Sequence, residues 1–146
     1  MGLMSKVSSI LNRKGFDVVT VTPKQSAMEA VNLMNEHRIG AVVVVEKGEV
    51  VGIFTERDLL RRIVAKGKKP EDTTVSESMS SPVAYCTPET TIEECRLAMT
   101  QKRIRHLPVV SGGKLAGLVS IGDVMAWEIS EHQTTIQYLN EYIAGR

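Results

Sequence analysis

Gly52-Ile53-Phe54-Thr55-Glu56-Arg57-Asp58 recurs 65 positions later as Gly117-Leu118-Val119-Ser120-Ile121-Gly122-Asp123. Each stretch has a glycine, two apolar residues, a hydroxyl residue and, three positions after the hydroxyl, an aspartate. A repeat at a fixed offset indicates one structural unit present twice. The similarity continues upstream without a gap through the pairs Thr22/Thr87, Pro23/Pro88, Glu29/Glu94, Met34/Met99, Arg38/Arg103, Ile39/Ile104, Val44/Val109, Val45/Val110 and Gly48/Gly113.

Each copy predicts the element order β-α-β-β-α. A short strand ends at Thr-Pro, and a Ser/Thr-x-x-Glu capping box opens the first helix. Two apolar runs around a turn-rich segment predict a β-hairpin, and a second helix follows directly. The matched segments are 18–21 and 84–86, 26–29 and 91–94, 41–45 and 107–110, 50–54 and 115–119, and helices that begin at Glu56 and at Ile121 or Gly122.

The expected fold is therefore mixed α/β (α+β), with two tandem units. Each unit of about 50 residues is too small to cover its own sheet well, so we expect the two to pack face to face with pseudo-twofold symmetry. Residues 1–66 are predicted to form the first repeat with an N-terminal lead-in helix, 67–76 a linker, and 77–146 the second repeat with an extended C-terminal helix.

Composition excludes several classes of protein. Lys plus Arg number 18 against 17 Asp plus Glu, a net charge of +1, so no basic footprint for nucleic acid is present. No apolar stretch approaches the ~18 residues of a membrane span, and no signal peptide is recognisable. Cys86 and Cys95 form no C-x-x-C pair. We therefore expect a cytoplasmic protein that binds neither nucleic acid nor membrane.

The hydroxyl and aspartate of the opening stretches allow two interpretations. Thr55 and Ser120 suit helix N-caps, and Asp58 and Asp123 suit the first helical turn, so all four residues are explained by capping alone. The same geometry also suits a ligand, because a helix N-terminus attracts phosphate and a carboxylate accepts hydrogen bonds from both hydroxyls of a ribose. Both interpretations remain open at this point.

The order Thr-Pro, Arg-Ile, Arg105-His106-Leu107-Pro108-Val109-Val110 and Gly-x-x-Ser/Thr-x-x-Asp resembles a pair of CBS motifs, named for cystathionine β-synthase. The resemblance covers nearly the whole chain and is closest to small bacterial proteins made only of the pair. It implies a regulatory module that senses energy or redox state and acts on an unknown partner protein. No cofactor is implied. The implied ligand is an adenine nucleotide: AMP, ADP, ATP, NAD(H) or S-adenosylmethionine.

The resemblance also implies two binding sites in the cleft between the repeats. In each, the Ser/Thr and Asp of one repeat hold phosphate and ribose, and the entry segment of the other repeat holds the base. Residues that open the middle strand face the phosphates. The first site would combine Thr55, Arg57 and Asp58 with Ser81, Pro82 and Val83; the second would combine Ser120 and Asp123 with Phe16, Asp17 and Val18; and the strand openings are Gly40-Ala41 and Arg105-His106.

The two sites are not expected to be equivalent. Arg57 is matched by Gly122, and the uncharged Gly40-Ala41 is matched by Arg105-His106. His106 is equally consistent with a structural role.

An intrinsic enzyme is not expected. His37, His106 and His132 lack the mutual spacing of metal ligands, and no Walker loop or G-x-G-x-x-G occurs. A Cys86–His106 nucleophile pair is compatible with the sequence, although Cys86 falls in a predicted buried strand, where an apolar setting raises the thiol pKa.

The last helix is predicted to continue to Ile143. An apolar stripe spaced by four and three is typical of helix packing. It would pack either on Val7, Ile10 and Leu11 of the same chain or on another subunit, and we favour a homodimer. A ligand-independent dimerisation or scaffold module is the alternative function. The stripe consists of Met125, Ile129, His132, Ile136, Leu139 and Ile143.

Overall fold

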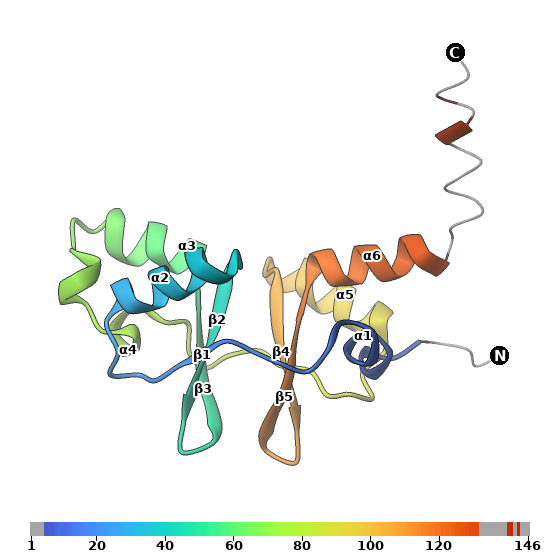
Figure 1. Cartoon of the computed structure of the whole chain (residues 1–146), viewed down its shortest axis with the longest axis horizontal. Helices are drawn as coiled ribbons and strands as arrows, with labels where there is room; N and C mark the ends of the chain where they lie inside the picture. Colours follow the sequence, from blue (N-terminus) through green and yellow to red (C-terminus); the bar gives the residue numbers. More distant parts are fainter. Residues whose placement is uncertain (1–4, 132–139, 142, 144–146) are drawn as a thin grey trace.

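The computed structural model describes residues 5–131, 140, 141 and 143 (Figure 1). In the first repeat, the strands form a sheet of order β1-β2-β3, with β1 parallel and β3 antiparallel to β2. Its second helix, α3, continues as a π-helix, η1. The elements are α1 (Val7–Lys14), β1 (Thr20–Val21), α2 (Ala27–His37), β2 (Ala41–Glu46), β3 (Glu49–Thr55), α3 (Glu56–Asp58), η1 (Leu59–Val64), the 3₁₀ turn η2 (Pro70–Asp72) and α4 (Val75–Ser78).

The second repeat follows the same order with one strand fewer. Its elements are α5 (Ile92–Lys102), β4 (His106–Ser111), β5 (Lys114–Ser120) and α6 (Ile121–Glu131). The two β-hairpins even share an irregularity, since the register shifts between Val44 and Val45 and again between Val109 and Val110. The tandem repeat is thereby confirmed, as β-α-β-β-α in the first copy and as α-β-β-α in the second.

The predicted strand at 84–86 is wrong, because only a single parallel bridge joins Cys86 to Val109. In the first repeat, the N–H of Val43 donates to the carbonyl of Val19 and extends the pairing of β1 with β2. Pro108 occupies the position of Val43 in the second repeat and has no N–H to donate. The ladder therefore cannot grow beyond the bridge.

Both predicted helix starts are capped, but only the second has the full capping box, because the Glu29 carboxylate accepts from Nε2 of Gln25 instead. The Ser26 side chain accepts from the N–H of Glu29, and Thr91 forms a full capping box with Glu94. The two helices also end alike, with Arg38 and Arg103 in the left-handed conformation (φ 55° and 56°). The Arg-Ile pair common to both repeats therefore marks the turn from the first helix into the hairpin.

The two repeats lie side by side, and β3 contacts β5 between them. Figure 1 shows α2 and α3 along one side of the molecule together with α5 and α6, while both hairpin turns lie at the opposite end. This arrangement brings the start of α3 and the start of β4 toward the boundary between the repeats.

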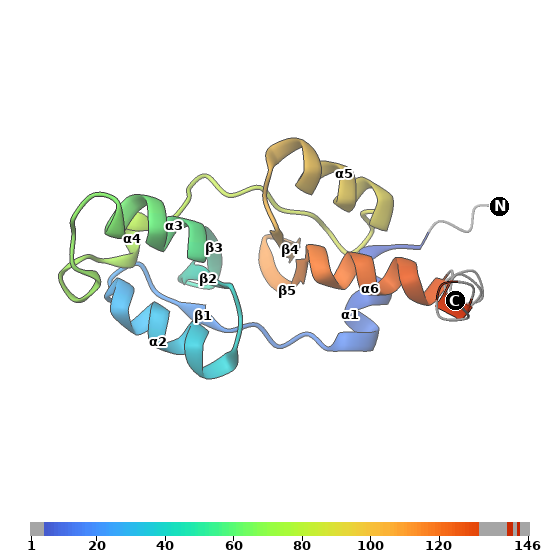
Figure 2. The same cartoon turned by 90° about the horizontal axis from the view of Figure 1, so that it is seen from above.

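Sequence order and spatial packing differ at two segments. Helix α1 precedes the first repeat, yet Val7, Ile10 and Leu11 share a core with Val124 of α6, and Figure 2 shows α1 beside α6. In return, Val75 of α4 packs in the core of the first repeat. The core of the second repeat is thus completed by α1, which precedes the first repeat, and the core of the first repeat is completed by α4, which follows it.

Two glycines allow this exchange. A Cβ on Gly52 would lie 2.5 Å from Sδ of Met79, and one on Gly117 would lie 2.7 Å from Cδ2 of Leu11. A larger residue at position 52 would force the Met79 side chain to shift, and one at position 117 would force the buried Leu11 side chain to shift.

The C-terminal stripe is only partly described. Its packing on α1 is confirmed for α6, but through Val124 rather than through the predicted stripe. Met125, Ile129 and Ile143 are exposed, whereas His132, Ile136 and Leu139 lie outside the described residues. Within the described ranges, no helix is both long and apolar enough to cross a bilayer.

Candidate functional site

A cavity of about 660 Å³ lies between the two repeats. A volume of this size falls within the ~300–1,000 Å³ typical of small-molecule sites. One wall comes from the end of β3 and the start of α3, and the other from the entry segment and the start of β4. Its lining residues are Gly40, Ile53, Thr55, Glu56, Arg57, Asp58, Ser80, Pro82, Val83, Ala84, Lys102, Ile104, Arg105 and His106.

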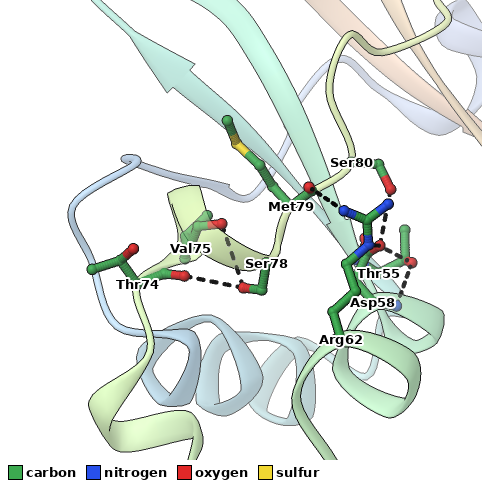
Figure 3. A network of polar contacts seen from close by, with 8 residues as sticks. All are labelled: Thr55, Asp58, Arg62, Thr74, Val75, Ser78, Met79 and Ser80. Carbon is green, nitrogen blue, oxygen red and sulfur yellow. Dashed lines mark hydrogen bonds and ion pairs between the residues drawn. The ribbon is translucent and has the colours of Figure 1, made fainter. Parts of the chain in front are cut away.

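Thr55 and Asp58 form a complete capping box at the start of α3. The N–H of Thr55 donates to Oδ2 of Asp58 at 3.0 Å, and the N–H of Asp58 donates to Oγ1 of Thr55 at 3.3 Å. The Thr55 hydroxyl also donates to the same carboxylate oxygen at 3.1 Å (Figure 3). The capping interpretation is therefore satisfied in full.

The second oxygen of Asp58 is held as well. Its Oδ1 accepts from the Ser80 hydroxyl at 2.9 Å and lies 3.3 Å from Nε of Arg62, as Figure 3 shows. Asp58 is only 4% exposed. A ribose hydroxyl that approached this carboxylate would share it with Ser80 or displace the Ser80 hydroxyl, since a carboxylate offers about four acceptor positions.

Three cationic side chains line the cavity. Nη1 of Arg57 donates to the carbonyl of Arg103 at 2.7 Å and so crosses from the first repeat to the second. Lys102 and Arg105 come from the second repeat, one at the end of α5 and the other just before β4, and both are exposed. Positive charge from both repeats thus converges on one space.

His106 lies against the first repeat. A Cβ on Gly40 would lie 3.5 Å from Cε1 of His106 and 2.9 Å from Oε1 of Glu56, so glycine leaves room for both. Burial, aided by the positive charges of Lys14 and Arg105, lowers the pKa of His106, although Glu56 and Asp123 partly oppose the shift. The imidazole is therefore neutral near pH 7.

This shift predicts a pH dependence of stability. Because the pKa of His106 is lower in the folded chain, the unfolded chain binds the proton more readily. The stability contribution is complete above pH ~6.5 and is lost as the pH falls through the folded pKa. Between about pH 7.5 and about pH 5.5, the melting temperature of the ligand-free wild type should fall more than that of His106→Gln. Equal falls in thermal denaturation would contradict the assignment.

The predicted second site is organised differently. Asp123 repeats the cap, since its Oδ2 accepts from the N–H of Ser120 at 2.8 Å. The same oxygen lies 2.7 Å from Nζ of Lys14, which also donates to the carbonyl of Leu118 at 3.0 Å. In the repeat alignment, Lys14 corresponds to Met79. The carboxylate of this half is therefore paired with a cation from α1.

The structure gathers most residues of the first predicted site and none of the second in this cavity. Ser81 does not line it; its neighbour Ser80 does. Phe16, Asp17, Val18, Ser120 and Asp123 do not line it either, and Phe16 is 57% exposed. The residues gathered are Gly40, Thr55, Arg57, Asp58, Pro82, Val83, Arg105 and His106, whereas Ala41 does not line the cavity.

Sequence reasoning missed Ser80, Glu56 and Lys102. Ser80 is 22 positions from its partner Asp58 and outside any motif. Lys102 carried one usable signal, because a cation in the last turn of a helix beside Arg103 lies close to the predicted strand opening. That position is also the ordinary place for a solvated lysine.

The Cys86 thiol is unsuited to act as a nucleophile. Its interaction with Cys95, together with burial, raises the pKa of Cys86, so the thiolate is disfavoured. Both cysteines are buried in the core of the second repeat. In the described part of the chain, no group of three or more His, Cys, Asp or Glu side chains is placed to hold a metal ion.

The structure is thus a two-repeat module with a cavity between the repeats, a capped helix start on one wall and cations from both halves. The chain belongs to the CBS domain family, whose model matches residues 7–65 and 71–130. The CBS domain-containing protein YhcV of Bacillus subtilis is 37% identical over 124 residues, which cover 85% of this chain and 88% of that protein. A putative signal-transduction protein with CBS domains from Burkholderia ambifaria is 41% identical, with a TM-score of 0.84 over 86% of this chain and 95% of that one.

A CBS domain pair with a bound ligand is also similar in structure. The pair of protein MJ0100, solved with 5′-methylthioadenosine and S-adenosyl-L-methionine, is 25% identical, with a TM-score of 0.78 over 88% of this chain and 98% of that chain. A hexameric CBS-CP12 protein from bloom-forming cyanobacteria is 29% identical, with a TM-score of 0.74 over 86% of this chain and 72% of that one. The MJ0100 pair thus binds adenosine compounds, and the CBS-CP12 protein assembles into a hexamer.

Proposed function

We propose that this chain is a non-catalytic regulatory module that binds an adenine nucleotide in the cavity between its repeats. The observation that carries the proposal is the convergence of Asp58, the start of α3 and the cations Lys102 and Arg105 on one space of about 660 Å³. The ligand of the MJ0100 pair supports an adenosine moiety. The module acts on a partner protein, works as a homodimer and is cytoplasmic.

The lining residues suggest which of them contact the base, the ribose and the phosphates of the nucleotide. Pro82, Val83 and Ile104 provide apolar surface suited to a purine. Asp58 is the acceptor suited to the ribose hydroxyls, and Arg57, Lys102 and Arg105 are suited to the phosphates.

Charge favours nucleotides with phosphate over S-adenosylmethionine. Arg57, Lys102 and Arg105 outnumber Glu56 and Asp58 in the lining. A sulfonium brings a further positive charge to this site, whereas a polyphosphate neutralises it. We therefore propose AMP, ADP, ATP or NAD(H) as the ligand class, with affinity that rises with the number of phosphates.

We expect one nucleotide per chain, because Lys14 occupies the carboxylate of the second repeat. Calorimetric titration with ATP, AMP, NAD⁺ and S-adenosylmethionine should give one equivalent for the phosphate-bearing ligands. Thermal denaturation should show stabilisation of about 2.7 kcal/mol at 100 times the dissociation constant. Absence of any heat or thermal shift at millimolar nucleotide would leave a ligand-independent scaffold as the function.

Alanine variants of the capping aspartates Asp58 and Asp123 are poor probes of nucleotide binding. Asp58 is buried and caps α3, so Asp58→Ala loses fold stability whether or not a ligand binds. The variants that separate binding from folding are those of the exposed cations.

A further inference from the structure

His106 is a titratable side chain that lines the cavity. It is the first residue of β4 and lies against the first repeat. A Cβ on Gly40 would be within 3.5 Å of both Cε1 of His106 and Oε1 of Glu56, so the two side chains approach one point from opposite repeats. Within the described part of the chain, the imidazole forms no hydrogen bond or ion pair, which leaves it available to a ligand.

Burial is the largest influence on the protonation of His106, and it lowers the pKa of the imidazole. Four charged side chains act on His106 as well. Glu56 of α3 and Asp123 of α6 favour the protonated form, whereas Lys14 of α1 and the adjacent Arg105 oppose it. Lys14 and Asp123 form an ion pair at 2.7 Å, so their opposite effects on His106 largely cancel. Without a ligand, the cavity therefore keeps the imidazole neutral near pH 7.

A bound polyphosphate changes this balance. Arg57, Lys102 and Arg105 line the same cavity, and phosphates held by them bring negative charge to the space that His106 lines. An opposite charge within ~4–6 Å favours the charged form of a side chain and shifts its pKa by about 1–3. The phosphates therefore favour the imidazolium form of His106. An imidazolium also attracts the nearby Glu56 carboxylate, whose charge otherwise repels phosphate from this wall.

We propose that nucleotide binding in the cavity is coupled to protonation of His106, so that the chain binds phosphate-bearing ligands more tightly as the pH falls. The coupling rests on the proposed function, because it requires such a ligand in the cavity. It belongs to one repeat only, since Ala41 stands at the position of His106 in the first repeat.

The direction of the effect follows from linkage between proton and ligand. At a pH where His106 is neutral both with and without nucleotide, its affinity contribution does not change with pH. As the pH falls through the pKa of the nucleotide-bound state, binding takes up a proton and the affinity rises. Below the pKa of the ligand-free state, His106 is protonated in both states and the affinity levels off.

Calorimetric titration with ATP from about pH 8 to about pH 5.5 tests the coupling. A terminal phosphate itself takes up a proton near pH ~6, so the quantity to compare is the affinity of the wild type relative to that of His106→Gln. This ratio should rise by about three- to tenfold over the range. His37→Gln is the matched control and should keep the wild-type profile, because His37 is exposed and does not line the cavity.

Proton NMR measures the same coupling on the wild type. The chain has three histidines, and the Cε1 proton of His106 is identified by the loss of its signal in His106→Gln. Saturating ATP should raise the pKa of His106 by about 1, whereas adenosine, which has no phosphate, should leave it unchanged. This measurement decides the question even if His106→Gln binds ATP too weakly for calorimetry.

The outcomes separate the coupling from nucleotide binding itself. If ATP binds but the pH profiles of the wild type and His106→Gln coincide, the coupling is overturned and the proposed function stands. The same holds if His106 titrates at the same pH with and without ATP. If the wild type binds no ATP anywhere in this pH range, the proposed function and the coupling both fail.

Discussion

Replacing both Lys102 and Arg105 by alanine is expected to weaken ATP binding at least 100-fold while the fold is retained. A hydrogen bond to a charged partner contributes ~1.5–3 kcal/mol, and ~1.4 kcal/mol is a tenfold change in affinity. Both side chains line the cavity and are exposed, so their removal leaves no buried group unpaired. Calorimetric titration gives the affinity, and thermal denaturation without ligand checks the fold.

Two controls make this prediction specific. Lys68→Ala with Lys69→Ala removes the same charge from an exposed part of the chain outside the cavity and should leave ATP affinity within about twofold. Adenosine has no phosphate, so its affinity should change little in the double variant. A comparable loss of affinity for adenosine, or an unchanged affinity for ATP, would show that Lys102 and Arg105 do not bind the phosphates.

The cap formed by Thr55 and Asp58 was accessible to sequence reasoning because it follows from local rules, whereas the composition of the first site was implied by the resemblance to CBS pairs. Thr55 and Asp58 lie within one helix turn. A helix that begins after Thr55 therefore brings the Thr55 hydroxyl and the Asp58 carboxylate together. The role of the strand opening Arg105-His106 was likewise implied by the resemblance, and the repeat alignment only showed that Gly40-Ala41 occupies the matching position. The cavity then required only that the two repeats face each other, which their size already indicated.

The second site was not accessible in the same way. Lys14 is 109 positions from Asp123. Packing of the last helix on Val7, Ile10 and Leu11 was one of two alternatives, and neither alternative indicated that Lys14 would reach Asp123. Sequence order assigned α1 to the first repeat, which follows it directly in the chain. In the structure, burial of Val7 and Leu11 against the second hairpin decided the packing of α1. The same exchange hid Ser80, because the segment after α4 returns to the first repeat and forms a bridge with Ile53.

The largest effect on stability is expected at Phe54. Phe54 is fully buried in β3 and is the only aromatic residue among the buried members of the two described core clusters, while Trp127 packs partly buried against the cluster of the second repeat. Phe54→Ala should lower the free energy of unfolding by ~3–5 kcal/mol, through lost burial and the cavity left behind. For a chain of this size, that change corresponds to a fall of about 10 °C or more in the melting temperature.

Val119 is the matched control, because it occupies the position of Phe54 in the second repeat and is also fully buried. Val119→Ala removes two methyl groups and should cost about 2 kcal/mol. Chemical denaturation of both variants measures the difference. Equal costs would mean that the first core collapses around the missing ring. Phe54→Ala is expected to lower the free energy of unfolding more than Val119→Ala does. Phe54 lies on β3, which pairs with β2, and the core against this sheet has no second residue of that volume.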